Sequence, residues 1–219
     1  MMRAVLVFVM WATATHAADY LSTSGRLSDT DFYRLVACRA LPGQDCKMPF
    51  VRWTPASASN LTVAITRVDP TFPPANASLI DGALGQAIGE INGLDAGVNM
   101  RRVTRNPNIK VLLMDHPPNS RLSGTGDPEL DGEWLEAAYV HIWWNGRREL
   151  TRGTIIITPA IERSSIRSVM LEELVQSLGL LTDVRSPHYR NRSIFAQDSN
   201  ATVRLQGQDA MAVRRHYTN

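Results

Sequence analysis

Two adjacent carboxyl side chains and an amide, close together in the chain, have the clearest capacity for chemistry. Glu172, Glu173 and Gln176 lie in the stretch 165–183, and a positioned carboxyl group can move protons in a reaction. Apolar side chains recur along this stretch every three to four residues, which predicts a helix: Ile166, Met170, Leu171, Leu174, Val175 and Leu178. At about 100° per residue, Glu172, Gln176 and Gly179 share a face off the apolar stripe, and Glu173 points between the two faces. Gly179 stands where the helix is expected to end.

The two glutamates have an ordinary interpretation as well as a catalytic one. Adjacent acids on an amphipathic helix usually form a solvated face. No basic residue stands three or four positions from either glutamate, so ion pairs within the helix do not account for them. Neighbouring helical side chains diverge by about 100°, which is poor geometry for two carboxyl groups that must flank one glycosidic bond. A solvated face and an acid–base site both stay open at this point.

The spacing is that of a zinc-protease helix without its imidazoles. In H-E-x-x-H the two histidines bind zinc and the glutamate is the general base, and here those positions hold Glu172, Glu173 and Gln176. The Gln176 amide and the Thr182 hydroxyl are poor zinc ligands, and Asp183 stands one residue past the usual third ligand. Oxygen atoms suit calcium or magnesium, but calcium takes about six to eight of them. We therefore expect no metal cofactor.

Candidate site residues follow from the assumption that this helix borders a cleft. Glu173 and Gln176 are the candidate catalytic residues, and Glu172, Asp183 and His188 are the candidate substrate-binding residues. His188 follows the helix in the sequence and could turn towards the cleft. The alternative for this side chain is a loop histidine in contact with solvent.

The first 17 residues are expected to be a secretory signal peptide. Arg3 gives the positive start, residues 4–12 form an apolar run, and Thr15-His-Ala17 is a small-residue cleavage site. Cleavage would leave a single domain, 18–219, in the periplasm or outside the cell, and an uncleaved N-terminal anchor is the alternative. No later stretch is long and apolar enough to span a membrane. The formal charge of +2 gives no general attraction to nucleic acid.

Cys38 and Cys46 are the two cysteines of the chain. In an exported protein, a pair this close in sequence predicts a disulfide. Closing so short a loop stabilises a fold by roughly 2–3 kcal/mol. Two reduced cysteines are the alternative, and a metal pair is not expected because no histidine lies nearby.

Periodic and alternating apolar patterns predict a mixture of helices and strands. Helices are expected at 28–38, 78–93 and 205–217, and strands at 50–53, 60–66, 98–103, 109–114, 138–144 and 154–158. Gly82, Gly85 and Gly89 lower the intrinsic stability of the long helix, and we attribute them to close packing on a sheet. The polar segment 115–133 is either a functional rim or lid or a plain surface loop.

Three patterns, in order along the chain, resemble the catalytic domain of metzincin proteases. They are the zinc-helix spacing at 172–179, Ser-Ile-Phe at 193–195 where metzincins have Ser-Ile-Met, and Leu-x-x-x-Asp followed by Tyr at 205–217. The resemblance implies an α+β, metzincin-like (zincin-like) domain. Such a domain has a mixed, twisted sheet with a long helix packed on it, followed by a degenerate active-site helix and a C-terminal helix.

The chain also resembles an uncharacterised bacterial family, domain-of-unknown-function family 2927, over about 29–217. The matching patterns are Cys…Pro-Gly…Cys at 38–46, Arg-Trp at 52–53, Glu-Glu-x-x-Gln-x-Leu-Gly-Leu at 172–180, and the Ser-Ile-Phe tripeptide. This family brings no settled activity with it.

A retained scaffold with lost imidazoles leads us to expect a pseudoenzyme. It would bind a peptide or a cell-envelope partner in a cleft beside Glu172, Glu173 and Gln176. The alternative is a peptidase-like hydrolase in which Glu173 is the acid/base and Gln176 orients substrate or water. A third class, a purely structural envelope protein, predicts no concave site beside Glu173.

Overall fold

The computed structural model describes residues 20–218, and its centre is a five-stranded sheet of order β3-β2-β4-β8-β7. The first four strands are parallel, and β7 pairs antiparallel with β8 at one edge. The strands are β2 (Leu61–Val68), β3 (Met100–Arg102), β4 (Ile109–Leu113), β7 (Ala138–Trp144) and β8 (Leu150–Ile157). The predicted α+β class with a mixed sheet is confirmed. The expected signal peptide, 1–17, lies outside the described residues.

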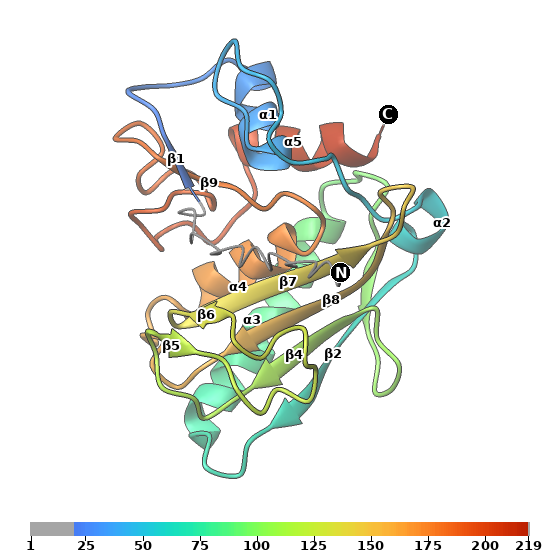
Figure 1. The fold of residues 1–219 in the computed structure, drawn as a ribbon, viewed down its shortest axis with the longest axis vertical. Coiled ribbons are helices and arrows are strands. Elements are labelled where there is room, and N and C mark those ends of the chain that lie inside the picture. The colour runs from blue at the N-terminus through green and yellow to red at the C-terminus, as the bar shows by residue number, and fades with distance from the viewer. Residues whose placement is uncertain (1–19, 219) are drawn as a thin grey trace, which may run out of the picture.

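The two faces of the sheet are covered differently. Helices α3 (Pro74–Asn92) and α4 (Ile166–Gln176) contact each other and cover one face, where the main apolar core lies (Figure 1). The other face carries the segment 115–137, which contains a small antiparallel pair, β5 (Ser120–Arg121) and β6 (Trp134–Leu135). A second, smaller apolar core forms under that segment.

A separate group of elements lies beyond the β7 edge of the sheet (Figure 1). Helix α1 (Asp29–Cys38) contacts α5 (Gly207–Tyr217), and β1 (Tyr20–Ser22) pairs in parallel with β9 (Asp183–Arg185). Ser28 caps α1 by accepting a hydrogen bond from the backbone N–H of Asp31 at 3.1 Å. The short helix α2 (Pro55–Ala58) precedes β2.

The predicted disulfide is confirmed, because Cys38 and Cys46 are bonded to each other. It ties the last residue of α1 to the loop that follows the helix. Within residues 20–218, no helix has the length and apolar character needed to cross a membrane.

Several expected elements differ from the structure. The strand expected at 50–53 is reduced to a single bridge between Arg52 and Glu149. Arg52 makes backbone hydrogen bonds to the segment 148–150, whereas the backbone groups of Val51 and Trp53 bond to the side chains of His216 and Tyr217. Helix α3 begins four residues early, at Pro74, where the missing N–H of proline costs no helical hydrogen bond. The expectation that the glycines of α3 allow close packing on the sheet is wrong. Gly82, Gly85 and Gly89 are all exposed, and a Cβ at any of them would meet no atom within 4 Å.

Candidate functional site around helix α4

Helix α4 lies beside α3 and the edge strand β7. Its apolar stripe is buried in the main core, as the sequence pattern predicts. The polar face is covered as well: Glu173 is 9% exposed, Gln176 is 7% exposed, and Glu172 is half-buried. These side chains therefore do not form a solvated face. The helix ends at Gln176, three residues before the glycine at which the sequence pattern places its end.

The C-terminal end of α4 is held by two aromatic side chains from distant parts of the chain. The Trp53 indole N–H donates to the carbonyl oxygen of Ser177 at 3.1 Å, and the Tyr217 hydroxyl donates to the carbonyl oxygen of Leu178 at 2.8 Å. The Tyr217 oxygen also accepts from the backbone N–H of Trp53 at 3.2 Å. Terminal carbonyls of a helix lack partners within the helix, so these bonds fix where α4 stops and how the next segment leaves it.

Gly179 allows the chain to pass close to Val51 as it leaves α4. A Cβ at this position would lie 2.1 Å from the carbonyl oxygen of Val51, and φ is +103°. The buried His216 side chain also contacts the Val51 carbonyl at this close approach. Its Nε2 lies 2.9 Å from the Val51 oxygen and its Nδ1 lies 3.1 Å from the Tyr33 hydroxyl. Because a carbonyl only accepts, Nε2 carries the proton. Burial lowers the pKa of His216 to about 4, so the ring is neutral near pH 7.

Three carboxyl groups gather beside the polar face of α4, and we call Glu172, Glu173 and Asp183 the acidic cluster. The Gln176 amide joins it by donating from Nε2 to Oδ1 of Asp183 at 3.0 Å. Burial raises the pKa of Glu172 well above its ordinary value, and the charges of Asp183, Glu173 and Asp209 raise it further. The structure thus brings together four of the five predicted site residues, and the surroundings of Glu172 favour its protonated form.

These residues do not fit a zinc ion. The three positions that hold histidines in the zinc motif are occupied by Glu172, Gln176 and Thr182. None of the three is an imidazole or a thiolate, the Gln176 amide nitrogen is hydrogen-bonded to Asp183, and Thr182 is buried. Among residues 20–218, no group of three or more histidine, cysteine, aspartate or glutamate side chains is placed to hold a metal ion.

The Ser-Ile-Phe tripeptide and the last helix are joined by a buried carboxyl group. Asp209, in the first turn of α5, accepts from the Ser193 hydroxyl at 2.6 Å and from the backbone N–H of Ile194 at 2.9 Å. Burial raises the pKa of Asp209 to about 7 against the lowering effect of both bonds. Phe195 is fully buried and meets Phe32 of α1 edge-on at 6.0 Å between ring centroids. The two sequence patterns therefore form one structural unit beneath α1.

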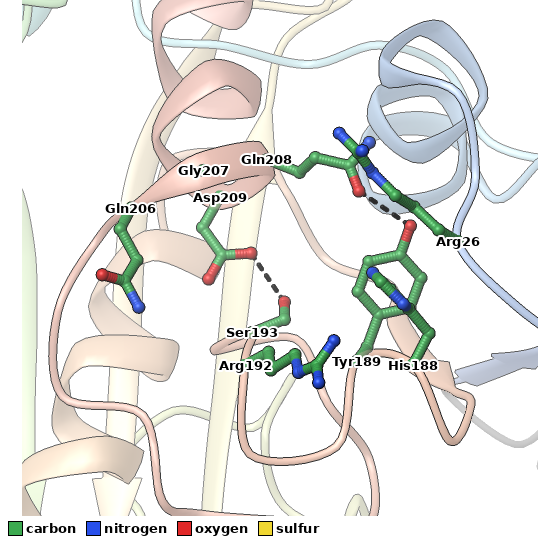
Figure 2. Close-up of a pocket in the computed structure, with 9 residues that line it drawn as sticks. All are labelled: Arg26, His188, Tyr189, Arg192, Ser193, Gln206, Gly207, Gln208 and Asp209. Carbon is green, nitrogen blue, oxygen red and sulfur yellow. Dashed lines mark hydrogen bonds between the residues drawn. The ribbon is translucent and has the colours of Figure 1, made fainter.

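His188 lines a pocket that the acidic cluster does not line. The pocket has a volume of about 330 Å³ and lies where α5 begins, with His188, Tyr189, Arg192 and Asp209 in its lining (Figure 2). Glu172, Glu173, Gln176 and Asp183 do not line it. Figure 2 shows the Asp209 carboxylate turned towards Ser193 and the His188 ring in front of Tyr189. The structure does not bring His188 together with the other predicted site residues.

Sequence reasoning missed two cations of this pocket, Arg26 and Arg192. Arg192 directly precedes the Ser-Ile-Phe tripeptide, so its position next to a recognised pattern was the available signal. Arg26 lies before α1 and shares no spacing with the other lining residues, so no sequence pattern indicated it. It reaches the pocket because α1 packs against α5.

Comparison with known protein families identifies the family of this chain. The model of the family described as "Protein of unknown function (DUF2927)" matches residues 43–219, which is most of the chain. The resemblance to this family that the sequence suggested is confirmed. A search of the curated proteins finds no match.

Proposed function

The chain belongs to the protein family of unknown function DUF2927, and we propose that this member is an exported protein that binds an extended peptide without cleaving it. The peptide would lie along the edge strand β7, beside α4 and the acidic cluster. We also propose that the fold is metzincin-like with a degenerate zinc helix. Two contacts support this: Ser193 with Asp209, and Tyr217 with the end of α4.

The observation that carries the proposal is the position of β7. Among the described residues β7 pairs only with β8, which leaves its other side as the edge of the sheet. An edge strand presents unpaired N–H and C=O groups that an extended peptide can join as a further strand. Helix α4 contacts β7, so a peptide at this edge would lie near the residues that the sequence marks as the site.

The backbone groups that would hold the peptide can be assigned. The Thr158 N–H donates to the carbonyl oxygen of Ala137 at 3.0 Å, and Ala138 pairs with Ile157. Backbone groups of an antiparallel strand point alternately towards its partner and away from it. The N–H of His141 therefore faces β8, whereas that of Val140 faces the outer edge.

Export is supported by the chemistry of the cysteines. Disulfides persist in oxidising compartments such as the periplasm and the extracellular space, and Cys38 is bonded to Cys46. The apolar run at 4–12 and the small residues at 15–17 are the expected signal. A fusion of residues 1–30 to a reporter that matures only after export would test this proposal, and a reporter retained in the cytoplasm would contradict it.

Peptide binding is tested by removing one outward N–H from β7. Linear nonapeptides selected from a phage library on the mature protein should bind the Val140→Ala variant as they bind the unaltered protein. Val140→Pro should lower the affinity for these peptides by about tenfold, equal to ~1.4 kcal/mol for a lost hydrogen bond at the edge. Proline is tolerated where the N–H of an edge strand faces outwards, and Val140→Ala controls for the lost packing of this half-buried side chain.

Circular dichroism would verify that the proline variant folds, and Ala138→Pro, at the first residue of β7, is the second variant at an outward N–H. The proposal is wrong if no peptide is selected, or if both proline variants bind as the alanine variant does. One equivalent of zinc in the purified protein would overturn its non-catalytic part.

A hydrolase is the second candidate, because burial and the neighbouring carboxyl groups raise the pKa of Glu172 and favour its protonated form. A protonated carboxyl group beside Glu173 is a suitable general acid. In this case Glu173→Gln would abolish cleavage of a fluorescent protein substrate and leave the melting temperature unchanged. Under the binding proposal the unaltered protein shows no cleavage that depends on Glu173.

A further inference from the structure

A second pocket of about 330 Å³ lies on the opposite side of the sheet from α4. It is formed between strands β2, β4 and β8 and the segment 125–130, and we call it the sheet-face pocket. Its volume is at the lower end of the range for small-molecule sites, roughly 300–1,000 Å³. It is separate from the proposed peptide site, so either proposal can fail without the other.

Lys110 and Thr154 form the floor of the sheet-face pocket. They are register partners on the parallel strands β4 and β8. Two residues further on, Leu112 and Ile156 are also register partners, and both pack in the second apolar core. Side chains two apart on a strand share a face, so Lys110 and Thr154 point to the side covered by segment 115–137.

Two arginines hold the covering segment over this floor. Arg67 donates to the carbonyl oxygen of Gly124 at 2.6 Å and to Asp69 at 2.6 Å. Arg152 donates to Asp127 at 2.6 Å and to Glu129 at 2.7 Å. These guanidinium groups are already matched by carboxylates, so their role here is to fix the walls of the pocket.

The floor is polar in a way that the fold itself does not require. The Lys110 ammonium makes no ion pair with any residue of the described chain. Thr154 is only 4% exposed, and its hydroxyl makes no hydrogen bond to a residue in 20–218. The Thr154 hydroxyl is not sealed in the core but is reachable from the pocket. A ligand in the pocket can therefore accept a hydrogen bond from it and from the Lys110 ammonium together.

We propose that the sheet-face pocket binds a small ligand through an oxyanion, either a phosphate ester or a carboxylate. Lys110 supplies the balancing charge and the Thr154 hydroxyl donates a hydrogen bond. Arg67 and Arg152 are matched by carboxylates, which leaves Lys110 as the cation of the lining that has no ion pair with a described residue, so an anion is favoured over a cation. Lysine commonly binds phosphate groups as a point charge.

The chain offers a matched control, because it contains two lysines, Lys47 and Lys110. Both are exposed, but only Lys110 lines the pocket. Pyridoxal 5′-phosphate condenses with a lysine amine, releases water and forms an imine, and borohydride reduces the imine to a stable secondary amine. We expect labelling of Lys110 to be about tenfold faster than that of Lys47. Inorganic phosphate should slow only the labelling of Lys110.

Direct binding provides the second measurement. Inorganic phosphate and acetate, titrated into the full chain against chloride at equal ionic strength, distinguish the two kinds of oxyanion. Lys110→Met should lower the affinity for the preferred anion by about tenfold, and Thr154→Val should lower it by several-fold. Lys47→Met should bind the anion as the unaltered protein does. Equal labelling of the two lysines, no protection by either anion, or unchanged binding by Lys110→Met would overturn the proposal.

Discussion

Asp209 is a carboxyl group that gains a proton when the chain folds. Burial raises its pKa to about 7, whereas an unfolded aspartate titrates near ~3.9. The folded state therefore holds one more proton than the unfolded state between about pH 4 and pH 7. The stability that this group contributes is fully present below about pH 4, and it is lost as the pH rises through about 7.

Asp209→Asn should flatten this pH dependence. Asparagine does not ionise, and its oxygen can still accept from the N–H of Ile194. The shift of about three units limits the effect to about 4 kcal/mol. Urea unfolding at pH 4, 6 and 8 should show the free energy of unfolding of the unaltered protein falling relative to that of the variant. Asp198→Asn, at an exposed ion pair with Arg185, is the control, and parallel curves for Asp209→Asn would contradict the prediction.

Gly179 is the residue at which adding a single methyl group should destabilise the fold most. Gly179→Ala places a Cβ 2.1 Å from the Val51 carbonyl oxygen at a φ of +103°. We expect a loss of roughly 3 kcal/mol or more, or no folded protein. Gly146→Ala, where a Cβ meets no atom within 4 Å, should leave the midpoint of urea unfolding nearly unchanged. A comparably small effect at Gly179 would be inconsistent with the close approach.

At the scale of elements, the sequence predicts what is long and periodic and misses what is short. β7 has the bounds that its alternation predicts, and α4 follows its apolar stripe. β1, β5, β6 and β9 have two or three residues each, too few to establish a period, so only their distant partners define them. The end of α4 differs because Trp53 and Tyr217 bind its last carbonyls, which a local pattern does not contain.

The glycines of α3 give the prediction that belongs to this scale. Gly82, Gly85 and Gly89 lie on the exposed side of the helix, where a Cβ meets nothing within 4 Å. Each change to alanine should therefore stabilise the protein by up to about 1 kcal/mol through helix propensity alone. Urea unfolding of the three single variants and the triple variant would measure this gain, and a loss at any position would reveal a contact that the structure lacks.

At the scale of the molecule, the sequence predicts the components of the site better than their assembly. Four of the predicted residues meet because α4 and β9 are close in the chain, whereas His188 is turned to the pocket beside α5. The sheet-face pocket was beyond sequence reasoning, because Lys110 and Thr154 become neighbours only through the pairing of β4 with β8. The segment 115–133 was expected to be either a lid or a plain loop, and it covers this pocket.

The disulfide joins α1, and through it α5, to the loop that follows α1. Cys38 is fully buried, Cys46 is exposed, and they stand eight positions apart in the sequence. The double variant Cys38→Ala/Cys46→Ser should lose roughly 2–3 kcal/mol, which lowers the melting temperature of a chain of this size by about 5–10 °C. The backbone N–H of Lys47 still donates to the Cys38 oxygen at 3.0 Å, so the variant should fold.

A reductant should lower the melting temperature of the unaltered protein by a similar amount and leave the variant unaffected. Equal melting temperatures without reductant would show that the α1–α5 unit does not depend on the bond.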